Sequence, residues 1–487
     1  MRARAAWRCA GGSASNVRGR VSLSVGLAVL GWGAGAGATG FSTARFAGEH
    51  GHVTTANPTA AYFNPAALSL TRSSALMIDG SLALRSVSFD HPRPSGSPAE
   101  PAGAEGANYG EGTLFNVFGG PSLGGTQRLT DSWVVAAGMF APFAGSGSYA
   151  KNDQFTGNTQ FPGAEDGIAR WHLIDGAQPT LYFTIASAFQ IGALSLGVSG
   201  NLVTTSVRTL RARNASFSDD LSTEGRSLLE VSGVHGSLGV GAMYEAMPEQ
   251  LWLGIAYQSQ PGFGEMKLTG ELTNYFGGFE EDTQRVDFYQ SLPDQLRVGG
   301  RYRPTSDWEL RLGLEYTRWS VFDRQCISAQ GSPCAVTRSG AQQPGTQTLG
   351  NFIRRWQDAY QVRLGASRFF GPEPIKPGPL KPRSGSPEPA RLEVFGGLGF
   401  DSSAVPDAYL EPALPDGNAI SAALGLRFPI SQALAAAMSY THLYYLPRDT
   451  VGKSELESFE GTSRSPDAGG KYKQQIGVIN ANLQADF

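Results

Sequence analysis

The stretch "ELRLGLEYTRW" (309–319) alternates in character from one residue to the next. Its even-numbered positions from 310 to 316 hold Leu, Leu, Leu and Tyr, and its odd-numbered positions from 311 to 317 hold Arg, Gly, Glu and Thr. Side chains of a strand point alternately to opposite faces, so this segment predicts a β-strand with one apolar and one polar face. A soluble β-sandwich shows the same local pattern, so this segment alone does not show whether its apolar face contacts lipid or a protein core.

The pattern recurs about fourteen times after residue 72, in segments of roughly ten residues separated by turns. One of these segments is 285–304, which is predicted to form a single strand. Many strand faces carry Gly, Ala and Ser, which would pack a soluble core poorly. Aromatic residues cluster near the segment ends, as in the girdles of outer-membrane barrels. The residues that suggest these girdles are Tyr182, Phe183, Trp252, Trp308, Trp319, Tyr444 and Tyr445. The sequence therefore predicts an all-β fold: a transmembrane antiparallel β-barrel of about 14 strands over 73–487.

Connections between the segments alternate between short and long, and in such barrels the short turns lie on the periplasmic side. Five of the six predicted periplasmic turns are short. The exception is "GPEPIKPGPLKPRSGSPEPA" (371–390), a Pro-rich insertion that we expect to form a semi-rigid excursion. We interpret these residues as an insertion that the fold tolerates. The alternative interpretation is that they tether a partner.

Composition and the N-terminus agree with an exported membrane protein. Charged residues make up 17% of the 487-residue chain, below the ~25% usual for soluble domains, and Gly is abundant at 63. The net charge of −3 predicts no nucleic-acid partner. A basic start, the apolar core "VSLSVGLAVLGW" (21–32) and "AGA" (36–38) predict a signal peptide over 1–38, since the core is too short for a membrane anchor.

Two cysteines remain after this leader, in "RQCISAQGSPCAV". Cys326 and Cys334 are close in sequence, and in an oxidising compartment they are expected to close a small loop as a disulfide. No His lies nearby to complete a metal site, so no metal is predicted.

Two Asn-Pro steps, Asn57-Pro58 and Asn64-Pro65, interrupt the apolar segment "TTANPTAAYFNPAALSL" (54–70). Asn-Pro marks turns, and the segment is too apolar for an exposed linker. Together with Gly40-Phe41 and Asn64-Pro65-Ala66, this region resembles the N-terminal hatch of the FadL-like long-chain fatty-acid transporters. "LPDQLRVGGRYRPTSDWELRLGLEYTRWSVFD" (292–323) resembles a later strand pair of that family.

The resemblance implies a function and a route. The hatch (39–72) would plug the lumen of a bacterial outer-membrane barrel that takes up long-chain fatty acids or similar hydrophobic compounds passively. Ligand would move from an apolar patch to a lumen pocket near the hatch and leave sideways through a kink in the third strand. Here that strand is "SWVVAAGMFAPFAG" (132–145), in which Gly138 and Pro142 weaken the ladder, although Pro142 could merely end the strand.

Candidate substrate contacts follow from the same resemblance. Asn64, Pro65 and Ala66 would shape the hatch, Gly40 and Phe41 would reach the pocket, and Phe140 and Phe143 would line the patch or the exit. Arg301, Arg311 and Arg363 lie on strands and are candidate cations for a carboxylate ligand. The other expected partners are outer-membrane lipid and the barrel assembly machinery, which would read the terminal aromatic Phe487.

Alternatives to fatty-acid uptake are an aromatic-hydrocarbon channel and a structural or adhesive barrel, which would not need a hatch. No H-E-x-x-H, G-x-S-x-G or G-x-x-x-x-G-K motif occurs, so no catalytic residue, cofactor or nucleotide-driven step is predicted. An outer-membrane enzyme would depend on His442, near Ser439 and Thr441, and mid-strand alternation explains that His without chemistry.

Overall fold

The computed structural model describes residues 51–71, 73–94, 100–143, 145–276, 280–371 and 391–487, all within one compact unit, Trp32–Phe487. The expected signal peptide (1–38), Gly40 and Phe41 lie outside the described residues, as does nearly all of the Pro-rich insertion. Among the described residues, no helix has the length and apolar character needed to cross a membrane.

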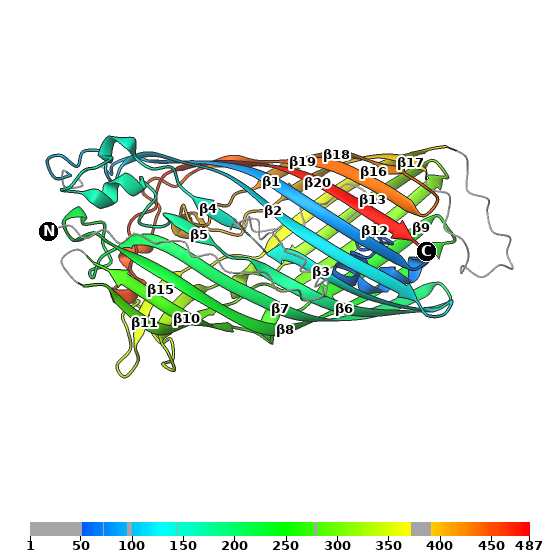
Figure 1. Cartoon of the computed structure of the whole chain (residues 1–487), viewed down its shortest axis with the longest axis horizontal. Helices are drawn as coiled ribbons and strands as arrows, with labels where there is room; N and C mark the ends of the chain where they lie inside the picture. The colour runs from blue at the N-terminus through cyan, green and yellow to red at the C-terminus, as the bar shows by residue number, and fades with distance from the viewer. Residues whose placement is uncertain (1–50, 72, 95–99, 144, 277–279, 372–390) are drawn as a thin grey trace, which may run out of the picture. The chain divides into compact units, whose positions relative to one another are not determined.

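Fourteen strands form a closed antiparallel barrel, as predicted, and Figure 1 shows it from the side. They are β1 (Ala75–His91), β2 (Gly110–Arg128), β3 (Trp133–Phe143), β6 (Thr180–Ile191), β7 (Leu194–Arg213), β8 (Gly225–Met247), β9 (Leu251–Gln258), β12 (Gln295–Thr305), β13 (Trp308–Thr317), β16 (Ala359–Phe370), β17 (Leu392–Asp401), β18 (Ala419–Pro429), β19 (Leu434–Asp449) and β20 (Lys471–Asp486). Each strand pairs with the next in this order, and β20 pairs with β1 from Asp486↔Ala75 to Lys471↔Asp90. The closure leaves no sheet edge, as a barrel in lipid requires.

One end of the barrel carries short turns and the other carries long loops. We call these the short-turn end and the long-loop end; in Figure 1 they lie at the right and the left. Six short strands extend the sheet at the long-loop end. They are β4 (Ser146–Ser148), β5 (Asp175–Ala177), β10 (Met266–Tyr275), β11 (Asp282–Gln290), β14 (Arg324–Ala329) and β15 (Thr348–Ile353). Strand β10 pairs with β8, and β11, β14 and β15 follow it as a ledge beyond the barrel.

Sequence patterning missed this ledge and treated 285–304 as one strand. That prediction was wrong, because β11 ends at Gln290 and β12 begins at Gln295. Pro293 lies in the break, and a proline cannot donate to a strand ladder. Two strands that belong to different parts of the sheet therefore looked continuous in sequence.

The barrel has its apolar face outside. Leu310, Leu312 and Leu314 of β13 are exposed, whereas Glu309 and Arg311 are buried on the inner face. This arrangement is the reverse of a soluble sandwich and matches a wall that faces lipid outside and polar groups inside.

The predicted aromatic girdles are correct for some residues and wrong for others. Phe183, Trp308 and Tyr444 are exposed on the outer face, but Tyr182, Trp252, Trp319 and Tyr445 are buried. The parity of β6 explains one error, because Tyr182 shares its face with the inward Thr184 and Ala186. Position near a strand end therefore did not determine which face an aromatic residue occupies.

The N-terminal segment, by which we mean 51–71, packs against the inner faces of β6, β7 and β8 toward the short-turn end (dark blue in Figure 1). It forms the helical turn α1 (Ala60–Phe63) and the 3₁₀ helix η2 (Pro65–Leu70). Arg128 of β2 holds its end by donating from Nη2 to the Ser69 carbonyl (2.7 Å) and from Nε to the Thr71 carbonyl (2.9 Å).

Glycines on the inner wall make room for this segment. A Cβ atom added at any of five of them would come within 3.0 Å of the N-terminal segment. We call these five residues the glycine seats. They are Gly124 of β2, Gly197 of β7, Gly241 of β8, Gly254 of β9 and Gly299 of β12. Gly197 lies opposite Gly241 in register, and Gly254 lies opposite Gly299. Close approach to the segment therefore explains part of the glycine content that argued against a soluble core.

We predict that Gly197→Ala displaces the N-terminal segment while the barrel still assembles. The new Cβ would overlap the backbone at Pro65 and Ala66, and such overpacking costs about 1–3 kcal/mol. Expressing cells should become more sensitive to vancomycin, with heat-modifiable migration of the protein retained. The matched control is Gly200→Ala on the same strand, whose nearest neighbour, Ile185 Cγ1, would lie 4.0 Å away. Equal vancomycin sensitivity in the two variants would contradict the prediction that Gly197 must be glycine for the N-terminal segment to pack against β7.

Candidate functional site

Both Asn-Pro steps act as local caps that make the N-terminal segment compact. Asn64 is fully buried; its Oδ1 accepts from the Ala66 amide (3.1 Å) at the start of η2, and its Nδ2 donates to the Val53 carbonyl (2.6 Å). Pro65 then occupies the first position of η2, where its missing N–H costs nothing. Asn57 makes the equivalent turn, with Oδ1 accepting from the Thr59 amide (2.9 Å).

Tyr62 of α1 connects this segment to an aromatic group on β3 and β6. Its ring centroid lies 5.4 Å from that of Tyr182 and 5.8 Å from that of Phe140. Phe143 lies 6.4 Å from Tyr182, and all four side chains are buried. The predicted contact residues Phe140 and Phe143 are thus placed together, beside the N-terminal segment.

The aromatic group continues into the long-loop end. Phe143 contacts Trp319 edge to face, with centroids 6.0 Å apart. Trp319 in turn lies 4.8 Å from Trp356 and 5.9 Å from Phe322. We call the series Trp356, Phe322, Trp319, Phe143, Tyr182, Phe140 and Tyr62 the aromatic series. Its ring contacts run without interruption from the loops that flank β14 and β15 to α1.

Strand β3 loses its regular alternation beside this series. Its last four residues, 140–143, are all buried, and its pairing with β6 shifts register between Phe140 and Phe143, where Pro142 lies. A Cβ at Gly138 would lie 2.7 Å from the Phe140 ring and 2.8 Å from the Leu123 carbonyl oxygen. Only glycine leaves space for Phe140 to fold back along its own strand, so the predicted Gly138 and Pro142 both belong to the irregular region.

The same irregularity opens the ladder between β2 and β3. Within the described residues their pairing ends at Leu123↔Met139, and residues 110–122 of β2 continue without β3. Two contacts link this part of β2 to the segment after β3. Asn116 Nδ2 donates to the carbonyl (2.8 Å) and to Oγ (3.0 Å) of Ser146 in β4, and the Ala150 amide donates to the Thr113 carbonyl (2.8 Å). We call this region the β2–β3 gap.

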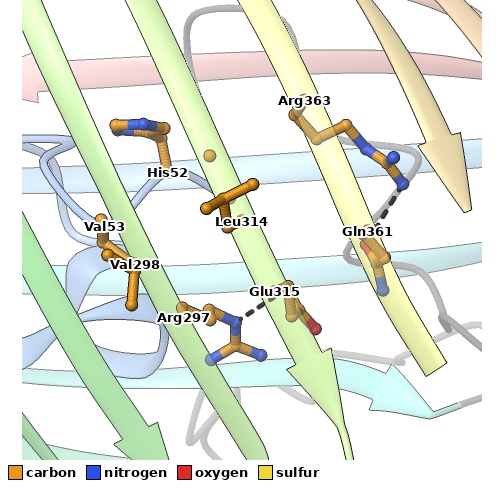
Figure 2. Close-up of a pocket in the computed structure, with 10 residues that line it drawn as sticks. His52, Val53, Arg297, Val298, Leu314, Glu315, Gln361 and Arg363 are labelled. Atoms are coloured by element: carbon orange, nitrogen blue, oxygen red, sulfur yellow. Dashed lines mark hydrogen bonds and ion pairs between the residues drawn. The ribbon is translucent and has the colours of Figure 1, made fainter. Parts of the chain in front are cut away.

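The opposite wall of the barrel carries paired charges next to the N-terminal segment. Figure 2 shows the pocket between them, with Arg297 beside Glu315 and Arg363 beside Gln361. Arg297 Nε lies 3.1 Å from Glu315 Oε2, and Arg363 pairs with Asp401. The residues that line the pocket are Gly51, His52, Val53, Arg297, Val298, Gly313, Leu314, Glu315, Gln361 and Arg363.

All three candidate cations from the sequence face inward. Arg311 pairs with Glu309 and lies 3.9 Å from Glu393, and Arg363 pairs with Asp401. Arg301 stacks on Trp252, with its guanidinium carbon 4.3 Å from the ring centroid. Two of the three therefore already have carboxylate partners.

His52 links the N-terminal segment to this charged wall as a neutral ring. Its Nε2 lies 2.9 Å from the Leu312 carbonyl oxygen, to which it must donate, and its Nδ1 accepts from Thr54 Oγ1 (2.8 Å). Burial lowers the pKa of His52 to about 4, and the nearby Arg311 and Arg301 lower it further against the raising effects of the Leu312 bond and Glu309. A proton on Nδ1 would remove the acceptor that Thr54 uses.

A buried ion cluster holds the loops together at the long-loop end. Arg354 pairs with Glu411, and His172 Nδ1 lies 3.4 Å from the same carboxylate, while His172 Nε2 lies 3.3 Å from the Asp467 carbonyl oxygen. Burial alone would raise the pKa of Glu411, but Arg354, His172 and Arg211 hold it well below its usual range. The carboxylate is therefore charged at neutral pH, and its stabilising effect is lost only in strong acid.

The predicted disulfide is not part of the aromatic series. Cys326 of β14 and Cys334 are joined in a disulfide on the ledge. Sequence reasoning did not find Trp319 or Trp356 as members of a lumen path, because no periodic pattern marks the loops that carry them. Tyr182 could have been found, since its strand parity is shared with small, inward residues.

The chain matches known proteins over most of its length. Residues 34–369 match the family model described as outer membrane protein transport protein (OMPP1/FadL/TodX). The long-chain fatty acid transport protein of Escherichia coli O6:H1 is 23% identical over 243 residues, which are 47% of each chain.

Two solved structures show the same fold. A Pseudomonas aeruginosa FadL homologue has a TM-score of 0.70 at 15% identity, over 94% of this chain and 100% of its own. The Ralstonia pickettii toluene transporter TbuX has a TM-score of 0.58 at 15% identity, over 88% of this chain and 94% of its own. The closed fourteen-strand barrel and the family match agree, and this chain belongs to the FadL/TodX family of outer-membrane proteins that transport hydrophobic compounds.

Proposed function

We propose that this channel takes up long-chain fatty acids or similar hydrophobic compounds passively across the outer membrane. The aromatic series carries the proposal, because it offers buried apolar surface all the way from the long-loop end to the N-terminal segment. A water-filled pore would instead present charge along an open lumen. The match to a fatty-acid transport protein supports the same substrate class.

In this proposal, residues 39–72 form a hatch that blocks the lumen, and Asn64, Pro65 and Ala66 give it its shape. Ligand enters among the loops around Trp319 and Trp356 and follows the aromatic series inward. Gly40 and Phe41 are proposed to complete the pocket at the hatch. Release requires the hatch to shift, since its backbone and side chains are packed against the glycine seats.

The β2–β3 gap supplies the proposed exit. Ligand that reaches Phe140 and Phe143 is next to the place where β2 loses its partner, so it can pass sideways between strands into outer-membrane lipid. Gly138 and Pro142 maintain this gap, because a continuous ladder would close it. The barrel assembly machinery is the other proposed partner, acting at the last strand.

Aromatic hydrocarbons are the second candidate substrate. Tilted and edge-to-face ring contacts line the path, and a flat monoaromatic ring could replace any of them. The fold is shared with a toluene transporter, which is consistent with this alternative. An adhesive barrel would need neither the aromatic series nor the β2–β3 gap.

The proposal predicts uptake of radiolabelled oleate by cells that lack their own transporter and express this protein. Trp319→Ala should lower the initial rate between about twofold and tenfold, because each ring contact is worth about 0.5–1.5 kcal/mol. The control is Trp308→Ala, whose indole faces the outside of the barrel. Labelled toluene is measured in parallel: transport of toluene alone would select the second candidate, and transport of neither would reject the proposed function.

Sideways exit predicts that closing the β2–β3 gap stops transport. In the double variant Asn116→Cys with Ser146→Cys, oxidation should bridge β2 to β4 and lower oleate uptake at least about tenfold, and a reductant should restore it. Each single cysteine variant, treated identically, controls for effects on the Cys326–Cys334 disulfide. Full uptake by protein whose bridge is verified by mass spectrometry would rule out this exit.

Hatch movement predicts a dependence on pH that originates at His52. When the N-terminal segment is packed in the barrel, the buried His52 has a pKa of about 4 and stays neutral between pH 7 and pH 5. When the segment moves away and His52 is exposed to water, its pKa returns to near 6.5 and the ring binds a proton as pH falls. The seated state therefore loses stability as pH falls below about 6.5, by about 2 kcal/mol at pH 5. Conductance of the purified protein in planar bilayers should rise between pH 7 and pH 5. His52→Gln should flatten this profile, and an unchanged rise in that variant would refute the role of His52.

A further inference from the structure

One arginine at the short-turn end binds both the N-terminal segment and the turn that leads into β3. On the segment side, Arg128 donates from Nη2 to the Ser69 carbonyl (2.7 Å) and from Nε to the Thr71 carbonyl (2.9 Å). On the other side, its Nη1 donates to the carbonyls of Asp131 (2.7 Å) and Thr130 (3.3 Å). A single guanidinium therefore bridges the end of the N-terminal segment and the β2–β3 turn.

The β2–β3 turn is itself anchored to a neighbouring strand. The amides of Leu129 and Thr130 donate to the Trp133 carbonyl (2.9 and 3.2 Å), which closes the turn. The Trp133 side chain is exposed on the outer face, and its Nε1 donates to Ser187 Oγ of β6 (2.9 Å). The turn is thus a fixed support, and Arg128 holds the end of the N-terminal segment against it.

The ladder beside Arg128 is the short one that borders the β2–β3 gap. Strands β2 and β3 share six residue pairs, the last of which is Arg128↔Val134. The N-terminal segment contacts β2 a second time within this stretch, because a Cβ at Gly124 would lie 2.8 Å from Pro58 Cβ. The segment therefore supports residues of β2 that are also paired with β3.

The chemistry of arginine suits such a bridge, since its planar fork presents several donors in fixed directions at once. Hydrogen bonds from a charged donor are stronger than those between neutral groups. Departure of the N-terminal segment would withdraw the Ser69 and Thr71 carbonyls from Arg128 and the Pro58 side chain from Gly124. The six-pair ladder would then lose both of these supports in one movement.

We propose that Arg128 is a positioning residue that couples the N-terminal segment to the β2–β3 gap. While the segment is packed against the wall, Arg128 holds the six-pair ladder closed at the short-turn end. When the segment moves, the ladder opens and the gap widens. The inference deepens the proposed function and rests on it, because it makes sideways exit of ligand conditional on movement of the hatch.

Backbone hydrogen exchange in the purified, ligand-free protein tests this coupling. Exchange is followed by mass spectrometry in peptides that cover 134–139 of β3. The N-terminal segment is locked in place with the pair Ser69→Cys and Ser195→Cys, since the two serine Oγ atoms lie 2.7 Å apart, within reach of a disulfide. The unlocked reference is Ser69→Cys alone, treated identically, and closure of the lock is verified by intact mass.

With Arg128 present, the lock should slow exchange in 134–139 at least about tenfold, because the ladder opens only when the segment leaves. In Arg128→Gln the same amides should exchange at least about tenfold faster, and the lock should no longer change their rate. The matched control is Arg391→Gln. Arg391 also binds turn carbonyls at the short-turn end, those of Ser306 (2.9 Å) and Phe369 (3.2 Å), and its loss should leave exchange in 134–139 unchanged.

The outcomes separate this inference from the proposed function. Exchange that Arg128→Gln does not raise would show that the ladder stands without Arg128. An equal effect of the lock with and without Arg128 would show that the guanidinium only stabilises the turn, and no effect of the lock in either form would show that the ladder opens independently of the segment. Each of these results overturns the coupling and leaves uptake standing. Lock-dependent exchange in a protein that takes up neither oleate nor toluene would support the coupling and reject the proposed function.

Discussion

Closure of the hydrogen-bond ladder between β1 and β20 is the constraint on which the rest of the structure depends. In lipid every backbone donor and acceptor must find a partner within the protein, so the first and last strands have to meet. Their register, from Ala75↔Asp486 to Asp90↔Lys471, leaves no free edge at that seam. With all fourteen strands committed to the ring, the early end of the β2–β3 pairing stands out, because residues 110–122 of β2 continue without β3.

Inside this ring the two halves of the lumen differ in chemistry. The β3–β6 side carries the aromatic series, and the β12–β17 side carries arginines paired with Glu315, Glu309 and Asp401. The N-terminal segment lies between them and uses a different residue for each side. Tyr62 faces the rings and also donates to Gln295 Oε1 (3.2 Å), and His52 bonds to the backbone of β13. Movement of the segment would therefore disturb both walls at once.

Most of the barrel was predictable because alternation is a local signal. Period-two patterning predicts the fourteen strands, the outward leucines of β13 and the inward arginines. The ledge was not predictable, because β11 and β12 read as one strand and only tertiary pairing separates them at Pro293. Of the candidate site, Phe140, Phe143 and Gly138 were named through a family resemblance, and the structure places the first two beside the N-terminal segment and Tyr182.

The glycine seats have a consequence for how this channel can diversify. At Gly197 and Gly241 the backbone of the wall touches the N-terminal segment directly, so no side chain of any size fits without a change on the other surface. A larger residue in the wall requires a smaller or shifted segment, and a bulkier segment requires more glycine in the wall. Sequence drift at the two surfaces is thereby coupled, and change is more readily accommodated in the loops than in the N-terminal segment itself.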